Sequence, residues 1–254
     1  MGDGISRKET AEGVQNPLAW LVTNFSPPME GKPSLLSHDE VITLFHEFGH
    51  GLHHMLTRVA YPAVSGINGV PWDAVELPSQ MMENWCWQDE VLEMISGHYE
   101  TGAPLPKDLV TRLKKAKNFQ AGMLLLRQIE FAIFDLSIHR GTVAVNVQQT
   151  LDQVRDEIAV FKPPHFNRFQ NSFSHIFAGG YASGYYSYSW AEVLSADAFS
   201  LFEEKGIFDP DTGRSFLENI LEKGGSEDPQ VLFTAFRGRK PEIEALLRHR
   251  GLAA

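Results

Sequence analysis

Residues 41–54 read VITLFHEFGHGLHH. Apolar side chains recur through this stretch with the period of a helix and not with the alternation of a strand, and Asp39 precedes them as the expected N-cap. On such a helix His46 and His50 lie one turn apart on the same face, where two imidazoles can bind one metal ion. Glu47 is rotated by about 100° from His46, so we expect it beside the metal, placed to take a proton from water. This arrangement is typical of zinc hydrolases.

A second interpretation of the same residues is a solvated helix face on which His, Glu and His fall at this spacing by chance. Two features favour the metal site. The histidines lie within a strongly apolar helix, where imidazoles without a metal would need other partners. A segment that carries carboxylates also follows at a workable distance, in residues 72–90.

Residues 72–90 again show helical spacing, and they offer two candidates for a third metal ligand. Glu76 and Glu83 are seven residues apart, which is two helical turns, so they share a face. Spacing alone allows either one. Pro78 is compatible with a helix if it lies in the first turn, which would place Glu76 at the entry of that helix. Alternatively, both are solvated glutamates, the commoner situation for this residue.

Composition excludes several classes of function. The formal net charge of -10 argues against a nucleic-acid partner, which would need a basic face. No apolar run approaches the length of a membrane span, and the first residues lack a signal-peptide core, so we expect a cytoplasmic protein without a membrane partner. The single cysteine, Cys86, cannot form an internal disulfide and is expected to be a buried apolar residue.

The rest of the chain predicts a mainly α fold of several helices with a small β element near the N-terminus. Residues 1–16 are polar and predict a loop or a frayed end. Residues 18–25 are apolar and bounded by prolines, which favours a strand; its partner would be residues 63–67 or a segment outside this chain.

Five further helices are expected. Two lie within 107–140, with an apolar core stripe that includes Phe119, Met123, Leu126, Phe131 and Phe134. One lies over 150–161, one begins at Asp209 and Pro210, and a last one is opened by Pro241 and ends before Gly251.

Residues 175–190, HIFAGGYASGYYSYSW, combine three glycines with four tyrosines. This composition predicts a flexible loop that runs into an aromatic helix start. Near a metal, tyrosine hydroxyls and a histidine could donate hydrogen bonds to the oxyanion that forms when water attacks a peptide carbonyl. A glycine turn followed by aromatic core residues is the equally weighted alternative.

Three segments together carry a resemblance to a known family. Residues 38–54 (HDEVITLFHEFGHGLHH), 70–85 (VPWDAVELPSQMMENW) and 174–199 (SHIFAGGYASGYYSYSWAEVLSADAF) resemble the thimet oligopeptidase family of zinc peptidases, and most of all its bacterial oligopeptidases. The resemblance runs from about Pro17 through the FRGRKPEIEALL ending, so it covers nearly the whole chain.

The resemblance implies a zincin-type catalytic domain with one zinc ion. In it, His46, His50 and Glu76 would be the zinc ligands and Glu47 the general base, while Glu83 would have a supporting role. It also implies that further side chains line the active site and stabilise the oxyanion or hold the substrate, namely His175, Tyr185 and Tyr188. Asp73 and Glu83 are the candidates for orienting the imidazoles.

Members of that family are usually well over twice this length, and the resemblance covers their C-terminal catalytic portion. We therefore expect residues 1–16 to be a flexible segment and residues 17–254 to be this catalytic portion, without the N-terminal half of the usual architecture. One wall of the substrate channel would then lie outside this chain. The apolar face left by it could promote self-association.

The predicted function is that of a zinc-dependent metalloendopeptidase acting on short peptides, because in the resembling family a deep channel restricts entry. Two alternatives remain open. The chain could bind zinc with impaired catalysis, or it could remove C-terminal dipeptides, as related dipeptidyl carboxypeptidases do.

Overall fold

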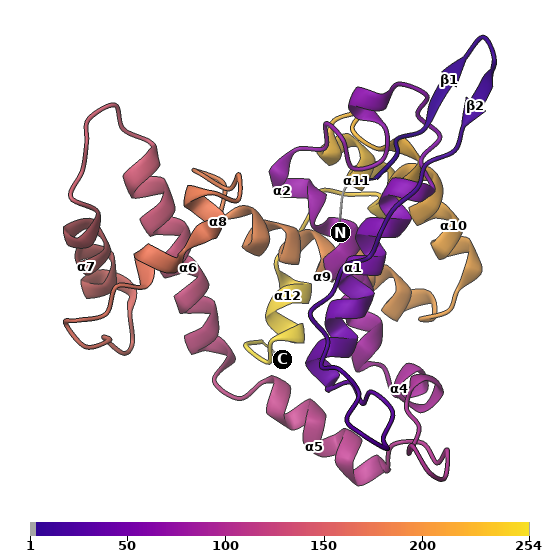
Figure 1. Cartoon of the computed structure of the whole chain (residues 1–254), viewed down its shortest axis with the longest axis horizontal. Coiled ribbons are helices and arrows are strands. Elements are labelled where there is room, and N and C mark those ends of the chain that lie inside the picture. Colours follow the sequence, from indigo (N-terminus) through magenta and orange to yellow (C-terminus); the bar gives the residue numbers. More distant parts are fainter. Residues whose placement is uncertain (1–3, 254) are drawn as a thin grey trace.

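Helices carry almost all of the regular structure in the computed structural model, which describes residues 4–253 (Figure 1). This confirms the mainly α prediction. The helices are α1 (His38–Met55), α2 (Trp72–Val75), α3 (Leu77–Glu83), α4 (Asp89–Ile95), α5 (Lys107–Lys117), α6 (Ala121–His139), α7 (Val147–Ile158), α8 (Ser174–Phe177), α9 (Ser187–Lys205), α10 (Pro210–Asn219), α11 (Pro229–Arg237) and α12 (Glu244–His249). Short 3-10 turns lie at Pro62–Val64, Asn84–Trp87, Phe169–Ser172 and Leu221–Lys223.

The β element near the N-terminus is a hairpin of two short strands, β1 (Lys8–Thr10) and β2 (Gly13–Gln15). The strands are antiparallel, with Lys8 opposite Gln15. It forms within residues 1–16, where the polar sequence predicted a loop. Gly13, at φ 136°, supplies the left-handed backbone that the tight connection requires. Residues 1–3 of the predicted flexible segment lie outside the described residues.

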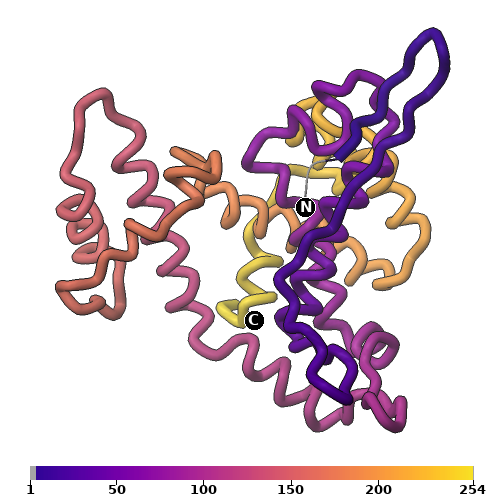
Figure 2. Tube along the Cα trace, in the orientation of Figure 1, coloured from indigo at the N-terminus to yellow at the C-terminus, as the bar shows by residue number. Residues whose placement is uncertain are grey.

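The predicted strand over residues 18–25 is wrong. Only an isolated bridge joins Leu18 to Ile5, and the chain then runs extended along α1, as the trace in Figure 2 shows. The backbone N–H of Ser26 donates to Glu40 Oε1 at 2.9 Å, so this segment is held by the helix and not by a sheet. Residues 63–67, which we predicted as a strand partner of this segment, begin instead in a 3-10 turn.

Helix α1 begins one turn before the apolar residues that predicted it. Its N-cap is Ser37 and not the expected Asp39. The Ser37 hydroxyl accepts from the Glu40 N–H at 3.2 Å, and the Glu40 carboxylate accepts from the Ser37 N–H at 2.7 Å. This reciprocal pair satisfies two backbone donors that a helix start leaves without partners.

The predicted helix over 72–90 is broken into α2, α3, a 3-10 turn and the start of α4. Glu76 lies at the break between α2 and α3, and Pro78 lies in the first turn of α3, as the proline placement predicted. Proline cannot donate the backbone hydrogen bond that would continue α2 through this point. The break therefore frees Glu76 to turn toward α1.

The predicted pair of helices within 107–140 is confirmed as α5 and α6, but much of their predicted core stripe is exposed. Phe131 and Phe134 are buried, whereas Phe119 is 71%, Met123 39% and Leu126 37% exposed. The reason is that the described part of the chain packs against the second half of α6, chiefly through α7, and leaves the first half open.

Helix starts in the last part of the chain follow their caps. Helix α7 begins earlier than predicted because Asn146 caps it by accepting from the Gln149 N–H at 3.1 Å. Asp209 caps α10 as predicted. The last helix, α12, ends before Gly251 as predicted, but it begins at Glu244 after the N-cap Ile243, so Pro241 does not open it. Among the described residues, no helix is both long and apolar enough to cross a membrane.

The two largest hydrophobic clusters among the described residues lie in two helical bodies (Figure 1). The larger core is built by α3, α9, α10 and α11 around Phe199 and Phe233. The smaller lies between α6, α7 and residues 169–185, around Phe134 and Leu151. Cys86 is fully buried, as predicted. The chain passes between the bodies through α5 and α6 and returns through α8 and α9, so the segment that joins α8 to α9 spans both.

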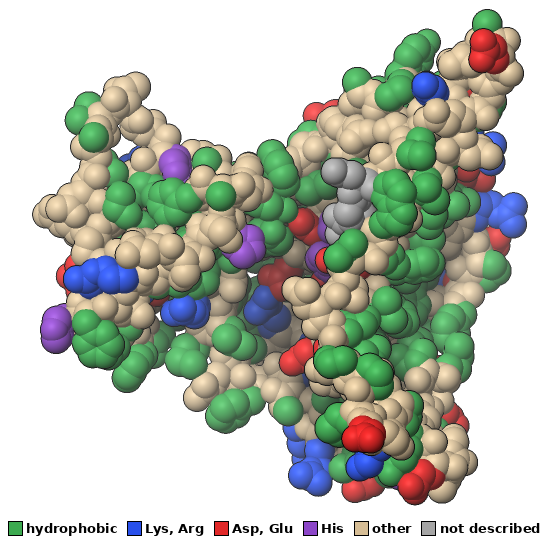
Figure 3. Space-filling model, in the orientation of Figure 1, with side chains coloured by type: hydrophobic (Ala, Val, Ile, Leu, Met, Phe, Trp, Pro, Cys, Tyr) green, Lys and Arg blue, Asp and Glu red, His purple; other side chains and the backbone are tan. Residues whose placement is uncertain are grey.

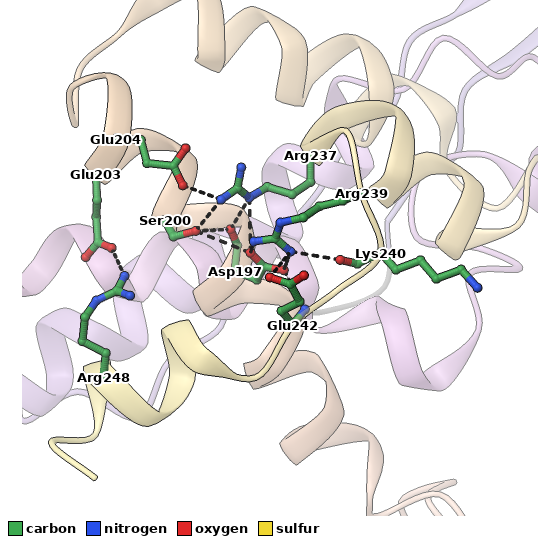
Figure 4. A network of polar contacts seen from close by, with 9 residues as sticks. All are labelled: Asp197, Ser200, Glu203, Glu204, Arg237, Arg239, Lys240, Glu242 and Arg248. Atoms are coloured by element: carbon green, nitrogen blue, oxygen red, sulfur yellow. Dashed lines mark hydrogen bonds and ion pairs between the residues drawn. The ribbon is translucent and has the colours of Figure 1, made fainter. Parts of the chain in front are cut away.

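A buried carboxylate fastens the C-terminal segment to α9 (Figure 4). Asp197 accepts two hydrogen bonds from Arg239, at 2.7 and 2.6 Å, one from Arg237 Nε at 3.2 Å and one from the Glu242 N–H at 2.8 Å. A buried charge that is paired and fully hydrogen-bonded in this way specifies one arrangement of the chain. The RGRKPE residues of the C-terminal motif therefore serve this junction.

Candidate metal centre

The crossing of α1 and α3 places the two candidate ligand segments against each other. A Cβ atom on Gly49 would lie 2.6 Å from the carbonyl oxygen of Pro78 and 2.6 Å from Cα of Ser79, so the helices can approach this closely only because residue 49 is glycine. Gly49 is the residue between Phe48 and His50 in the HEFGH motif. The motif thus provides two candidate ligands and the close contact that brings the third candidate near.

Three side chains converge at this crossing, and they are the predicted metal ligands His46, His50 and Glu76. Their ligand atoms all lie within 4.8 Å of one another. Oε2 of Glu76 is 3.4 Å from Nε2 of His46 and 3.1 Å from Nε2 of His50. In Figure 3, histidine and acidic side chains gather around the hollow between the two bodies. Glu83 does not belong to this group of three.

Glu83 contacts the other side of the His46 ring. Its Oε1 lies 2.7 Å from Nδ1 of His46, so Nε2 of that ring is the atom that faces Glu76. Burial opposes protonation of His46, but hydrogen bonds to Glu76 and Glu83 raise its pKa to about 9. The structure therefore separates the two glutamates that spacing left equivalent: Glu76 lies in the group of three, and Glu83 contacts His46 from the other side.

Glu76 is buried and receives hydrogen bonds from several directions. The hydroxyl of Ser79 donates to Oε2 at 2.9 Å, and the hydroxyl of Tyr181 donates to Oε1 at 2.9 Å. Burial penalises the charged carboxylate, but the hydrogen bonds from His46 and His50 hold the pKa of Glu76 well below its usual range. The third candidate ligand is thus kept ionised and fixed in position.

Glu47 follows His46 on α1 and is half-buried. The helical rotation of about 100° per residue turns its side chain away from the direction that His46 and His50 share. It is accordingly not one of the three grouped ligand residues. Its place beside a bound metal, where it would take a proton from water, stays a prediction.

Residues 178–186, here called the tyrosine loop, bring aromatic side chains to the same place. The ring of Tyr188, at the start of α9, stacks on that of Tyr181 with centroids 4.8 Å apart. Burial raises the pKa of Tyr188 to about 12, so its hydroxyl stays protonated and able to donate. The exposed ring of His175 lies 6.3 Å from that of Tyr188 and 6.0 Å from that of Tyr185. The structure therefore brings together His175, Tyr185 and Tyr188, the three residues expected to contact substrate or the oxyanion.

Tyr185 differs from the other tyrosines because its hydroxyl is already engaged. It donates to Oε1 of Gln128 on α6 at 3.2 Å, and its ring packs against Phe131 and Phe173. Burial raises the pKa of Tyr185. This side chain belongs as much to the smaller core as to the metal centre, which combines the two interpretations of the tyrosine segment.

Two supporting residues escaped the sequence analysis, and one prediction was wrong. Ser79 could have been found, because it lies three residues after Glu76. Tyr181 belongs to the tyrosine segment but lies 105 residues from Glu76, so no local pattern pairs them. Asp73, predicted to orient an imidazole, instead lines a separate cavity with Trp190 and Leu194.

A cavity of about 480 Å³ opens beside the grouped ligands. Its walls include His50, Glu76 and Tyr181 together with the apolar side chains of Ile67 and Trp72. The ring of Trp72 packs on that of Tyr181 with centroids 4.4 Å apart. A pocket that is part apolar and part polar next to candidate metal ligands has the character of a small-ligand or peptide site.

Several known proteins match the sequence of this chain over nearly its whole length. Oligopeptidase A of Haemophilus influenzae is 60% identical over 256 residues, which cover 99% of this chain and 38% of the relative. Oligopeptidase A of Escherichia coli is 58% identical with the same coverage. The dipeptidyl carboxypeptidase of Salmonella typhimurium is 38% identical over 260 residues, which cover 99% of this chain and 37% of the relative.

The chain thus spans 38% of the length of the two oligopeptidases it matches. The family described as Peptidase family M3 matches residues 1–252. These matches confirm the resemblance that the three sequence segments carried. On the combined evidence of these motifs and matches, the chain belongs to peptidase family M3.

Proposed function

We propose that this chain is the catalytic portion of a zinc metalloendopeptidase that hydrolyses peptide bonds in short peptides. The observation that carries the proposal is the convergence of His46, His50 and Glu76, whose ligand atoms lie within 4.8 Å of one another, in a chain of a peptidase family. The names of the two similar oligopeptidases support short peptides as the substrate class. Residues 17–254 would form the catalytic portion, and a cytoplasmic location stays a prediction.

The three side chains fit a zinc ion. Two imidazole nitrogens and one carboxylate oxygen are a ligand set typical of catalytic zinc, and ligand atoms around a tetrahedral zinc lie about 3.3 Å apart. The separations of 3.4 and 3.1 Å between Glu76 and the two histidines match this spacing. The Glu83 contact to His46 is the carboxylate–histidine support that catalytic zinc sites use.

When bound, zinc would supply a Lewis acid that activates water and polarises the scissile carbonyl. Side chains of this protein would transfer the protons and stabilise the developing charge. Glu47 takes the proton of the attacking water and passes it to the leaving amine. The hydroxyl of Tyr188, with His175 and Tyr185 near it, donates to the oxygen on which negative charge develops. Glu83 and Tyr181 keep His46 and Glu76 in place throughout.

Removal of C-terminal dipeptides is the second candidate, since a dipeptidyl carboxypeptidase is 38% identical to this chain. Two peptides of one sequence, one with a free and one with an amidated C-terminus, separate the two activities. An endopeptidase cleaves both at the same internal bond. A dipeptidyl carboxypeptidase releases a dipeptide from the free form and spares the amide. Mass spectrometry of the products distinguishes these outcomes.

The central test is zinc stoichiometry measured together with turnover of an internally quenched peptide. We expect one zinc per chain, and turnover that a chelator abolishes and added zinc restores. A chain that binds one zinc but shows no turnover would support the alternative of impaired catalysis. A chain that binds no zinc under conditions where it is folded would overturn the proposal.

A further inference from the structure

Asp135 is a buried carboxylate that the mechanism above does not use. It lies near the end of α6 and has no exposed surface. Its Oδ1 accepts from the backbone N–H of Ser183 at 3.0 Å, and its Oδ2 accepts from the backbone N–H of Tyr185 at 2.9 Å. Nδ1 of His139, one turn later on α6, lies 2.7 Å from Oδ1. A buried charge is retained only where such partners compensate its desolvation.

The two amides that Asp135 binds belong to the tyrosine loop, at a point where the backbone is strained. Ser183 has φ 57°, in the left-handed region that residues other than glycine adopt rarely. Such a conformation persists where the surrounding structure holds it. The carboxylate accepts from the N–H on both sides of Gly184 and so holds this turn against α6.

The loop connects this clamp to the metal centre. Two residues before Ser183, the hydroxyl of Tyr181 donates to Glu76. Three residues after Tyr185 stands Tyr188, whose ring stacks on that of Tyr181. Both tyrosine rings therefore take their position from a backbone segment whose hydrogen bonds to Asp135 anchor it to the other helical body.

We infer that Asp135 is a positioning residue that places the tyrosine loop, and through Tyr181 and Tyr188 couples the α6 body to the metal centre. It touches none of the three grouped ligands, and acts through the backbone amides of residues 183 and 185. The catalytic part of this inference rests on the proposed function. The structural part, that this carboxylate holds the loop, does not.

Hydrogen exchange of the full chain, resolved to single amides by NMR, tests the structural part. In Asp135→Ala, the amides of Ser183 and Tyr185 should exchange at least about tenfold faster than in the wild type, because they lose their acceptor and the loop opens locally. Asp135→Asn keeps one acceptor oxygen, so only one of the two amides should lose protection. It also serves as the reference if the alanine variant folds poorly.

Glu130→Gln is the matched control. Glu130 is buried on the same helix and pairs with Arg155 of α7 at 3.0 Å, so its loss disturbs α6 without touching the tyrosine loop. Exchange at residues 183 and 185 should stay within about twofold of the wild type in this variant. Unchanged protection in both Asp135 variants, or equal loss in Glu130→Gln, would overturn the inference.

Kinetics of the same variants test the catalytic part. Misplaced oxyanion donors should lower kcat by roughly 10- to 100-fold while KM changes by less than about threefold, with Asp135→Asn closer to the wild type than Asp135→Ala. A general loss of stability would not produce this order or this split. If the wild-type chain shows no turnover, the proposed function fails, whereas the exchange result still decides whether Asp135 holds the loop.

Discussion

The hydroxyl of Tyr181 donates a 2.9 Å hydrogen bond to Oε1 of Glu76, joining the tyrosine loop to the third candidate ligand across 105 residues of sequence. Burial and the neighbouring Glu76 charge raise the pKa of Tyr181, so the phenol remains a donor. This bond orients the carboxylate from the side opposite Ser79. It is the direct link between the aromatic segment and the metal centre.

Tyr181→Phe should weaken zinc binding by about tenfold, the lower end of the range for the loss of a residue that supports a ligand. The ring and its packing on Trp72 are retained, so the fold should not change. Competition with a fluorescent zinc chelator measures the affinity. Equal affinity of the variant and the wild type would show that Ser79 alone orients Glu76.

The two glutamates of residues 72–90 should respond differently to substitution. Glu76→Ala removes one of three ligands and should abolish stoichiometric zinc binding. Glu83→Ala leaves the ligands in place but frees the His46 ring, and should weaken binding by roughly 10- to 100-fold. Zinc content after dialysis at a fixed free zinc concentration separates them. Loss of zinc from Glu83→Ala with retention in Glu76→Ala would reverse the assignment.

Glu47→Gln should keep zinc and lose hydrolysis. The amide cannot accept the proton of water, so the rate should fall by at least about 100-fold, while all three ligands remain. Zinc stoichiometry and turnover are measured on one preparation, with His46→Ala as the variant that loses both. Full activity of Glu47→Gln would rule out this residue as the general base.

Acid should destabilise the metal-free protein through His53. This buried side chain has its pKa lowered from 6.5 to about 3 by burial, with the charges of His50 and His54 acting in the same direction. As pH falls below about 6.5, His53 therefore binds a proton in the unfolded chain but not in the folded one. The contribution of His53 to the free energy of unfolding is complete above that pH. It is lost as pH falls toward 3, at up to about 1.4 kcal/mol for each pH unit.

Urea unfolding of the metal-free chain at pH 6.5, 6.0 and 5.5 measures this dependence. The variant His53→Leu should show a smaller loss over the same range, whatever its stability at pH 6.5. If the free energy of unfolding fell equally with pH in the two proteins, His53 would take up its proton in the folded state as readily as in the unfolded chain.

The exposed half of α6 should make the chain self-associate. Met123 is 39% and Leu126 37% exposed, one turn apart on α6, and Phe119, just before this helix, is 71% exposed, so apolar side chains lie open on the surface here. Size-exclusion chromatography with light scattering should show a mass that rises with concentration. Met123→Glu should reduce this, whereas Val143→Glu, at an exposed residue beyond α6, should not. A monomer at all concentrations would contradict the prediction.

Local patterns predicted the parts of the fold that depend on local interactions. The α1 helix that carries His46 and His50, the division into α5 and α6, and the Asp209 cap all follow from periodicity and capping chemistry within a few residues. The strand over 18–25 failed because a short apolar run does not identify what the segment packs against. That segment lies along α1, and its Leu18, Trp20 and Val22 side chains stay exposed.

The amino-acid sequence by itself determined that His46 and His50 share one face of a helix and that Glu47 points in another direction, because helical geometry sets those directions over a single turn. Only the tertiary structure decided that Glu76 joins them while Glu83 orients His46, since both glutamates satisfy the same local spacing. The choice depends on the α1–α3 crossing, on the break between helices α2 and α3 next to Pro78, and on Tyr181 from a distant loop. Such contacts arise from packing between remote segments, and no local period encodes them.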